Sequence, residues 1–249
     1  MLLTGKQSAE TLYTEIDQRV KDLSTVPGLF AVYNPEDVTA GWYLRSIQRA
    51  GEAHGIPVYA HPLSEGWELP EKKLGGMIVL SKTQLPVVIP EELDVDGRDP
   101  NSHNTLYVGG LKNRFPRNTP CTAESCVRLL EHYGVPVSGR HAVILSRSMT
   151  VGRPLAMLLI DRDATVTICH SKTRNLIEHC RQADILVCAT GKAGLIGKDC
   201  VRPGQTVLNV GGDVVEEEVI PIVENISPFK GGVGALTTAV LFKHVTDLS

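Results

Sequence analysis

Residues 141–154, HAVILSRSMTVGRP, join an apolar run to a polar turn and the start of a helix. The run His141–Leu145 is typical of a buried strand, and the pattern after the turn predicts a helix over residues 151–160. Such a turn can bind an anion, because unpaired N–H groups and the helix dipole point at it. Only Gly152 fills a glycine position of the pattern GxGxxG, and Ser146 stands where its first glycine is expected. The motif alone is a weak signal, since such turns also occur without a ligand.

The same alternation of strand and helix continues toward the C-terminus. Apolar runs predict strands over residues 164–169, 185–189 and 206–210, and a further helix is predicted over residues 174–182. Strands that alternate with helices form βαβ units, so we expect an α/β fold with a parallel sheet.

The end of the strand predicted at residues 164–169 indicates which dinucleotide binds. In NAD-binding domains an acidic residue at this point binds the ribose hydroxyls. Here the strand is followed by HSKTR at residues 170–174, without a carboxylate, and Arg147 and Ser148 lie in the first turn. Basic and hydroxyl groups suit a 2′-phosphate, which favours NADP over NAD. The alternative is that residues 172–174 only begin a solvent-facing helix.

The amino-terminal half is less regular. It is rich in loops from residue 81 to residue 120, and the stretch 64–73 leaves little room for a crossover helix. Thr122 is expected to cap the helix that follows. The predicted helices cover residues 6–23, 39–54 and 122–133, and the predicted strands cover residues 29–33, 56–60 and 76–80.

Composition excludes several classes of protein. With 249 residues, a net charge of −3 and 5% aromatic residues, the chain is unlike a nucleic-acid-binding protein and has room for one large or two modest domains. It holds no apolar run near the ~20 residues of a membrane span and no secretory signal in MLLTGKQSAE, so we expect a cytoplasmic protein. The six cysteines form no CxxC pair and no zinc spacing, which favours buried, reduced thiols and no metal site.

The stretch SRSMTVGRPLAMLL at residues 146–159 is similar to the signature GRSxxVGxPxxxLL, and further short motifs accompany it along the chain. Together these ordered motifs resemble the methylenetetrahydrofolate dehydrogenase/methenyltetrahydrofolate cyclohydrolase family of the FolD type. The likeness covers nearly the whole chain, which is identified as a divergent and shortened member. The other matches are GK at 5–6, PGL at 27–29, DVDG at 94–97, PCT at 120–122, LL at 129–130, ATVT at 164–167, HSKT at 170–173, ADIL at 183–186, GK at 191–192 and GGVG at 231–234.

The resemblance implies a homodimer of two-domain subunits that oxidises 5,10-methylenetetrahydrofolate to the methenyl form with NADP and then hydrolyses that product. An amino-terminal α/β domain, residues 1–137 with 229–249, would bind the reduced folate, and a Rossmann-like domain, residues 138–228, would bind NADP. The implied catalytic residues are Tyr43 and Asp96. The implied cofactor-binding residues are Ser146, Arg147, Ser148, Val151, Gly152, His170, Ser171, Thr190, Gly191 and Gly211, and the implied substrate-binding residues are Tyr43, Asp96, Lys230, Gly231 and Gly232.

One departure from the family affects its chemistry. The family's catalytic pair is a tyrosine and a lysine four residues later, on one face of a helix. Spacing from PGL at 27–29 puts the tyrosine at Tyr43 and the lysine position at Ile47, and neither Arg45 nor Arg49 shares that face. Isoleucine cannot transfer a proton or carry a charge. Hydrolysis needs an activated water, whereas hydride transfer needs mainly alignment of the two reactants. We therefore expect dehydrogenase activity with cyclohydrolase activity weak or lost.

Other departures fall in the same expected folate pocket. Leu80 replaces a family glutamine, and the sequence PFKGGVGA at residues 228–235 puts Lys230 near the expected site. Lys82 could supply the missing ammonium, although a surface lysine is the favoured interpretation. Two alternatives stay open, namely a non-catalytic NADP- or folate-binding homologue and a dehydrogenase for another one-carbon carrier.

Overall fold

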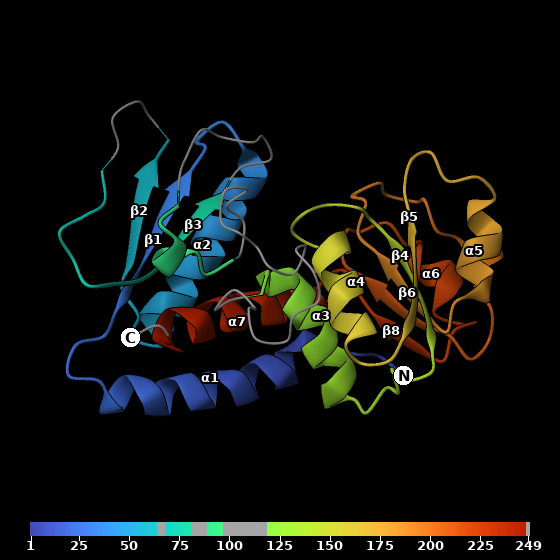
Figure 1. The fold of residues 1–249 in the computed structure, drawn as a ribbon, viewed down its shortest axis with the longest axis horizontal. Coiled ribbons are helices and arrows are strands. Elements are labelled where there is room, and N and C mark those ends of the chain that lie inside the picture. The colour runs from blue at the N-terminus through green and yellow to red at the C-terminus, as the bar shows by residue number, and fades with distance from the viewer. Residues whose placement is uncertain (64–67, 81–88, 97–118, 248–249) are drawn as a thin grey trace. The chain divides into compact units, whose positions relative to one another are not determined.

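The computed structural model of the protein describes residues 1–63, 68–80, 89–96 and 119–247. Figure 1 shows the order of its helices and strands along the chain. The α/β class and the parallel sheets predicted from the sequence are confirmed. The chain forms two compact units. The five-stranded unit comprises Met1–Ala9 and Thr122–Thr237, and the three-stranded unit comprises Glu10–Cys121 and Thr238–Ser249.

The five-stranded unit is built on a parallel sheet in the order β5-β4-β6-β7-β8. All residues of β6 and β7 are buried, as expected for central strands that are covered on both faces. Its strands are β4 (His141–Leu145), β5 (Thr165–Cys169), β6 (Ile185–Cys188), β7 (Thr206–Asn209) and β8 (Asn225–Ser227).

This strand order creates a topological switch point. The chain leaves β4 for β5 on one side and then returns to pair β6 on the other side of β4. In open parallel sheets ligands bind outside the carboxyl ends of the strands at such a reversal. The loops that follow β4 and β6 are therefore the natural place for a ligand in this unit.

The three-stranded unit has a parallel sheet in the order β2-β1-β3, with its strands at Gly28–Tyr33 (β1), Val58–Pro62 (β2) and Leu74–Leu80 (β3). Predicted strand 56–60 is shifted, because Ile56 donates its N–H to the Gly51 carbonyl oxygen at 2.9 Å and closes the preceding helix. Pairing with β1 then begins at Val58.

That preceding helix is α2 (Val38–Ala53), which contacts all three strands and lies beside them in Figure 1. The Asp37 carboxylate accepts hydrogen bonds from the N–H groups of Thr39 and Ala40 and caps the helix. Its buried stripe follows helical spacing and consists of Ala40, Leu44, Ile47 and Gly51.

The remaining helices agree with the predicted segments to within two residues at each end where a helix was predicted. No helix in the described part of the chain is both long and apolar enough to cross a membrane. The helices are α1 (Gly5–Asp22), α3 (Cys121–His132), α4 (Gly152–Ile160), α5 (Leu176–Gln182), α6 (Glu216–Val219) and α7 (Val233–Asp247), with short 3₁₀ turns η1 (Glu91–Leu93) and η2 (Lys198–Cys200).

The cysteines are structural. All six lie in the described part of the chain, where they are buried and form no disulfide. Burial raises the pKa of the Cys126 and Cys180 thiols to about 12, and it holds that of Cys188 well above its ordinary value. Thiols of this kind stay protonated at neutral pH and are poor nucleophiles.

Candidate functional site

The turn between β4 and α4 brings the helix start very close to the end of the strand. A Cβ at position 152 would lie 2.1 Å from the Ser146 carbonyl oxygen, so only glycine fits there. This is the role of the glycine that lets helix and strand pack closely in dinucleotide-binding folds. Gly152 therefore serves the fold of the turn, which agrees with its place in the predicted nucleotide site.

Ser148 organises the amide groups at the head of this helix. Its hydroxyl oxygen accepts hydrogen bonds from the N–H groups of Val151 at 3.1 Å and Gly152 at 3.2 Å. Ser146 is buried, and its hydroxyl lies 3.2 Å from that of Ser148. Arg147 is exposed beside them. The turn thus combines hydroxyl groups, a helix start and a cation, the groups that bind phosphate.

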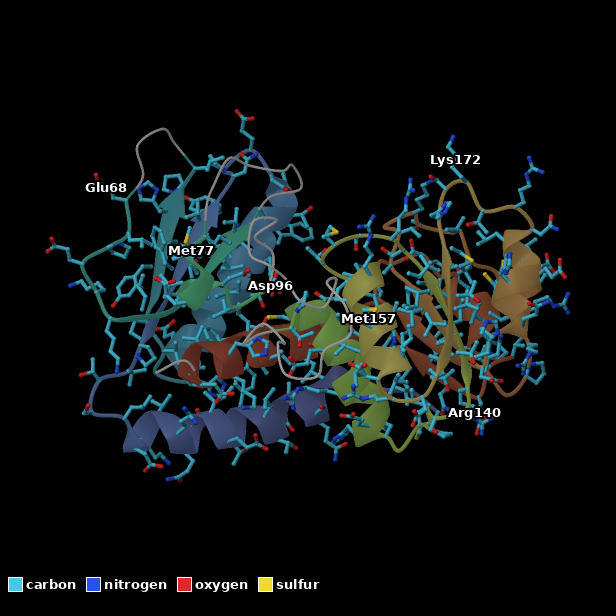
Figure 2. All side chains as sticks on the ribbon, in the orientation of Figure 1. Glu68, Met77, Asp96, Arg140, Met157 and Lys172 are labelled. Carbon is cyan, nitrogen blue, oxygen red and sulfur yellow. The ribbon has the colours of Figure 1, made fainter. Side chains whose placement is uncertain are left out.

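The turn after β5 carries the residues predicted to select NADP. The main-chain N–H of His170 donates to the Thr173 hydroxyl at 2.9 Å, and the His170 ring nitrogen Nδ1 accepts from the Lys172 N–H at 3.1 Å. Ser171, Lys172 and Arg174 are exposed, and Figure 2 shows Lys172 projecting away from the turn. A turn held this way presents hydroxyl and cationic side chains at the carboxyl end of the strand.

The loops after β6 and β7 meet around a buried carboxylate that sequence reasoning missed. Asp213 accepts hydrogen bonds from the N–H groups of Thr190 and Lys192, which follow β6. A Cβ at Gly211 would lie 2.5 Å from the Asp213 carboxylate and 2.8 Å from the Gly191 nitrogen. The predicted residues Thr190, Gly191 and Gly211 are therefore brought together. The sequence signal was an aspartate directly after the glycine pair that ends a buried strand.

The segment after β8 carries three of the predicted substrate residues. Gly231 has a φ of +78°, and a Cβ at Gly232 would lie 2.1 Å from the Pro228 carbonyl oxygen and 2.3 Å from the Ser227 hydroxyl. Lys230 is exposed on this tight turn. These residues belong to the five-stranded unit, whereas Tyr43 and Asp96 belong to the three-stranded unit.

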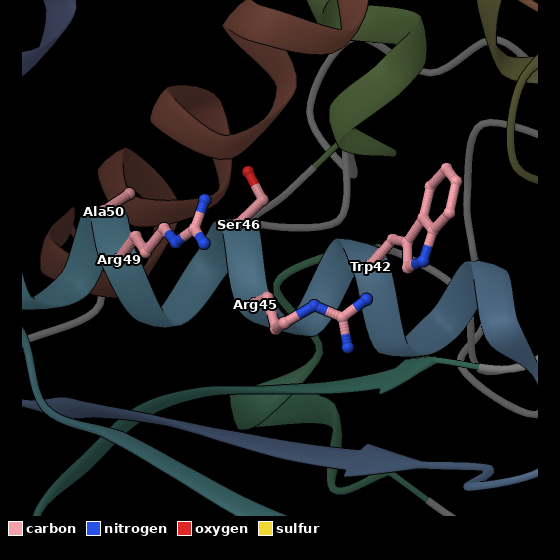
Figure 3. A pocket seen from close by; sticks show the side chains of 5 residues that line it. All are labelled: Trp42, Arg45, Ser46, Arg49 and Ala50. Carbon is pink, nitrogen blue, oxygen red and sulfur yellow. The ribbon is translucent and has the colours of Figure 1, made fainter.

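In the three-stranded unit, α2 carries Tyr43 and Ile47 one helical turn apart. Tyr43 is half-buried, whereas Ile47 has 0% of its surface exposed. An open pocket of about 560 Å³ lies along the outer face of α2 and is lined in part by Arg45 and Arg49, as Figure 3 shows. Both arginines are directed to this outer face, away from the buried stripe that holds Ile47.

Asp96 is positioned by the segment that precedes it. Asp94 pairs with Met77 of β3, and the Val95 side chain packs where any side chain on Gly76 would stand. One carboxylate oxygen of Asp96, which Figure 2 labels, accepts the N–H of Cys121 at 2.8 Å. The helix α3 begins at Cys121, so Asp96 caps it and the prediction that Thr122 does so is wrong.

Two further predictions concern Lys82 and the absence of a metal site. Lys82, the possible substitute for the family lysine, lies outside the described residues. Among the described residues, no group of three or more His, Cys, Asp or Glu side chains could hold a metal ion.

Comparison with known families agrees with the motifs. Residues 120–249 match the family described as "Tetrahydrofolate dehydrogenase/cyclohydrolase, NAD(P)-binding domain". The bifunctional protein FolD of Kosmotoga olearia is 37% identical to this chain, with 98% of this chain and 95% of that protein covered. FolD of Carboxydothermus hydrogenoformans is 36% identical, with 97% and 94% covered.

Solved structures give the same result. The methylenetetrahydrofolate dehydrogenase-cyclohydrolase of Trypanosoma brucei, solved with NADP cofactor and an inhibitor, matches with a TM-score of 0.87 and 25% identity, covering 100% of this chain and 96% of that one. FolD of Campylobacter jejuni matches with a TM-score of 0.86 and 29% identity, covering 100% and 98%. The chain therefore belongs to the FolD family of methylenetetrahydrofolate dehydrogenase/cyclohydrolases.

Proposed function

We propose that the protein is an NADP-dependent methylenetetrahydrofolate dehydrogenase whose cyclohydrolase activity is weak or absent. The dehydrogenase part is supported by family membership over nearly the full length of the chain. The loss of hydrolysis rests on one observation, the fully buried hydrocarbon side chain of Ile47 at the family's lysine position.

The residues around the switch point fit NADP. A Cβ at Gly152 or at Gly211 would clash with the protein's own atoms, so both glycines are needed for the shape of the loops that would hold the nucleotide. Arg147 and Ser171 are exposed at the carboxyl ends of β4 and β5, and the turn after β5 offers no carboxylate to repel a 2′-phosphate. The other proposed contacts are Ser146, Ser148, Val151, His170, Thr190 and Gly191.

Bound NADP⁺ supplies the hydride acceptor, and the methylene carbon of the substrate is oxidised to the methenyl cation. The protein's part is to orient the two reactants, which can account for much of the rate. We assign Asp96 to hydrogen bonding with the pterin amino and ring N–H groups, because a carboxylate accepts such bonds well. Tyr43 would orient the reacting end of the folate through its hydroxyl, and Lys230, Gly231 and Gly232 would contact the substrate from the loop after β8.

Hydrolysis of the methenyl cation has a further requirement. A water must lose a proton as it attacks, and a positioned acid–base group typically accelerates such a step by about 10²–10⁴-fold. Ile47 offers no such group, and Arg45 and Arg49 line the outer face of α2. Arginine also stays protonated and cannot act as the base.

We further propose that residues 1–137 with 229–249 form the folate domain and residues 138–228 the NADP domain, and that the protein acts as a homodimer in the cytoplasm. The resemblance to the FolD family supports the domain division and the homodimer. Light scattering on the protein as it elutes from a size-exclusion column measures its molar mass. We expect the mass of two subunits, and the mass of one subunit would contradict the dimer.

The test of the function is NADPH formation from methylenetetrahydrofolate by purified protein, with NADP and NAD compared at equal concentration. We expect NADPH to form with NADP, and Tyr43→Phe to lower kcat/KM by roughly tenfold or more. Tyr13→Phe is the matched control, because Tyr13 stacks on His54 in the same unit at a ring distance of 3.9 Å. Nucleotide binding without turnover would favour the non-catalytic homologue, and turnover of another pterin alone would favour a different one-carbon carrier.

A further inference from the structure

Asp213 follows the glycine pair after β7 and is completely buried, with 0% of its surface exposed. Its carboxylate accepts hydrogen bonds from the Thr190 N–H at 3.0 Å and from the Lys192 N–H at 2.8 Å. The Thr190 hydroxyl donates a third, short hydrogen bond to it. One side chain from the β7 loop thus collects three donors from the β6 loop.

A carboxylate in this position must be stabilised by its surroundings, since burying a charge is unfavourable unless hydrogen bonds or a counter-charge compensate it. Within the described residues, Asp213 forms no ion pair with a lysine, arginine or histidine. Its compensation comes from the loop Thr190–Lys192 instead. The carboxylate and the loop therefore depend on each other for their structure.

The loop lies where the strand order predicts a ligand. It follows β6, which pairs with β4 at the topological switch point. Gly191 has a φ of +72°, a left-handed conformation that needs an outside constraint to be the only one populated. Gly211 completes the packing, because a Cβ there would touch both the Asp213 carboxylate and the Gly191 nitrogen.

We propose that Asp213 is a positioning residue for the cofactor: it fixes the backbone of residues 190–192 in the shape that binds NADP without touching NADP itself. The Thr190 hydroxyl donates to Asp213 and also accepts the Lys192 N–H at 3.2 Å. It is therefore engaged within the loop, and the loop backbone is left as the contact to the nucleotide. The inference rests on the proposed function, since it assumes NADP at this switch point.

The chain offers a matched control at the opposite end of the same strand. Asp184 directly precedes β6, accepts the His141 N–H at 3.0 Å and pairs with Arg202 at 3.1 Å. Like Asp213, it accepts a hydrogen bond from a backbone N–H group, but it does so at the amino ends of the strands, away from the switch point. Asp184→Asn therefore reports what a purely structural carboxylate contributes.

The experiment is a fluorescence titration of NADPH into the wild-type chain and into Asp213→Asn, Asp184→Asn and Thr190→Val, each below its own unfolding temperature. Asparagine has one acceptor oxygen and an NH₂ group that would face an N–H donor, so it can no longer accept all three hydrogen bonds from the loop. We expect Asp213→Asn to raise the Kd for NADPH about tenfold or more and Thr190→Val to raise it less, as lost hydrogen bonds to a charged group do. Asp184→Asn should stay within about twofold.

Steady-state kinetics adds a second readout. Asp213→Asn should raise the KM for NADP and leave the KM for the folate unchanged, which general destabilisation would not do. Equal Kd values for Asp213→Asn and Asp184→Asn would overturn the inference. If Asp213→Asn does not fold, Thr190→Val decides, and an unchanged Kd there has the same meaning. A wild-type chain that binds no NADPH would instead contradict the proposed function, and with it this inference.

Discussion

In our proposal, Ile47 is the residue at which the two reactions of the family separate. Its side chain is fully buried on the stripe of α2 that faces the three-stranded sheet. A lysine at this position would have to bring a charge to a place that the fold fills with hydrocarbon. Spacing along the sequence was enough to place Ile47 at the family's lysine position. Its burial became known only from the structure, because burial depends on what the helix packs against.

A single substitution tests the role of Gly152 in the turn after β4. Gly152→Ala would put a Cβ 2.1 Å from the Ser146 carbonyl oxygen, so the turn must move. We expect a loss of roughly 1–3 kcal/mol in the free energy of unfolding, together with weaker NADPH binding. Urea denaturation and the NADPH titration measure the two effects. Gly234→Ala is the control, because its Cβ would meet no atom within 4 Å, and equal losses in both variants would contradict the role of Gly152.

Arg147 tests the preference for NADP. Arg147→Gln removes the exposed cation beside the predicted 2′-phosphate site, and we expect it to raise the Kd for NADP about tenfold while leaving that for NAD unchanged. Arg140 is an exposed arginine that directly precedes β4, and Arg140→Gln should change neither Kd. A parallel loss of affinity for both nucleotides on Arg147→Gln would show that the arginine does not read the 2′-phosphate.

At the scale of elements, the helix α2 both covers the sheet and carries Tyr43. Its start depends on Asp37, whose carboxylate binds the Thr39 N–H at 2.9 Å. Asp37→Ala should lower the free energy of unfolding by about 1 kcal/mol, as loss of an N-cap does. Glu36→Ala, the exposed neighbour, should have little effect in the same denaturation experiment. A stability of Asp37→Ala equal to that of Glu36→Ala would exclude capping as the role of Asp37.

Sequence patterns predicted most elements but missed those defined by distant contacts. The apolar runs of β4 to β7 are long enough to be recognised alone, whereas Asn225–Ser227 has only one apolar residue and becomes a strand by pairing with β7. The start of β2 is shifted because Ile56 bonds to α2. Asp213 was missed for the same reason, since its partners lie 21 and 23 residues away.

For the molecule as a whole, Asp184 makes a contribution to the free energy of unfolding that depends on pH. The His141 N–H, and then Arg202, hold the pKa of the Asp184 carboxyl below its ordinary value. Between the folded and the unfolded pKa the unfolded chain binds more protons, so this contribution is present above the ordinary pKa and is lost as pH falls through the folded one. The stability difference between wild type and Asp184→Asn should therefore shrink from pH ~7 to pH ~3. A difference that stays constant over this range would contradict the assignment.

We propose that this FolD-family chain oxidises methylenetetrahydrofolate without hydrolysing the product, and the stoichiometry of one reaction tests this claim. Purified protein, NADP and methylenetetrahydrofolate are mixed, and NADPH and methenyltetrahydrofolate are quantified together over time. We expect one methenyl product for each NADPH, with the product decaying no faster than it does in buffer. NADPH that accumulates without the methenyl product would show that hydrolysis survives despite Ile47, and would contradict the claim.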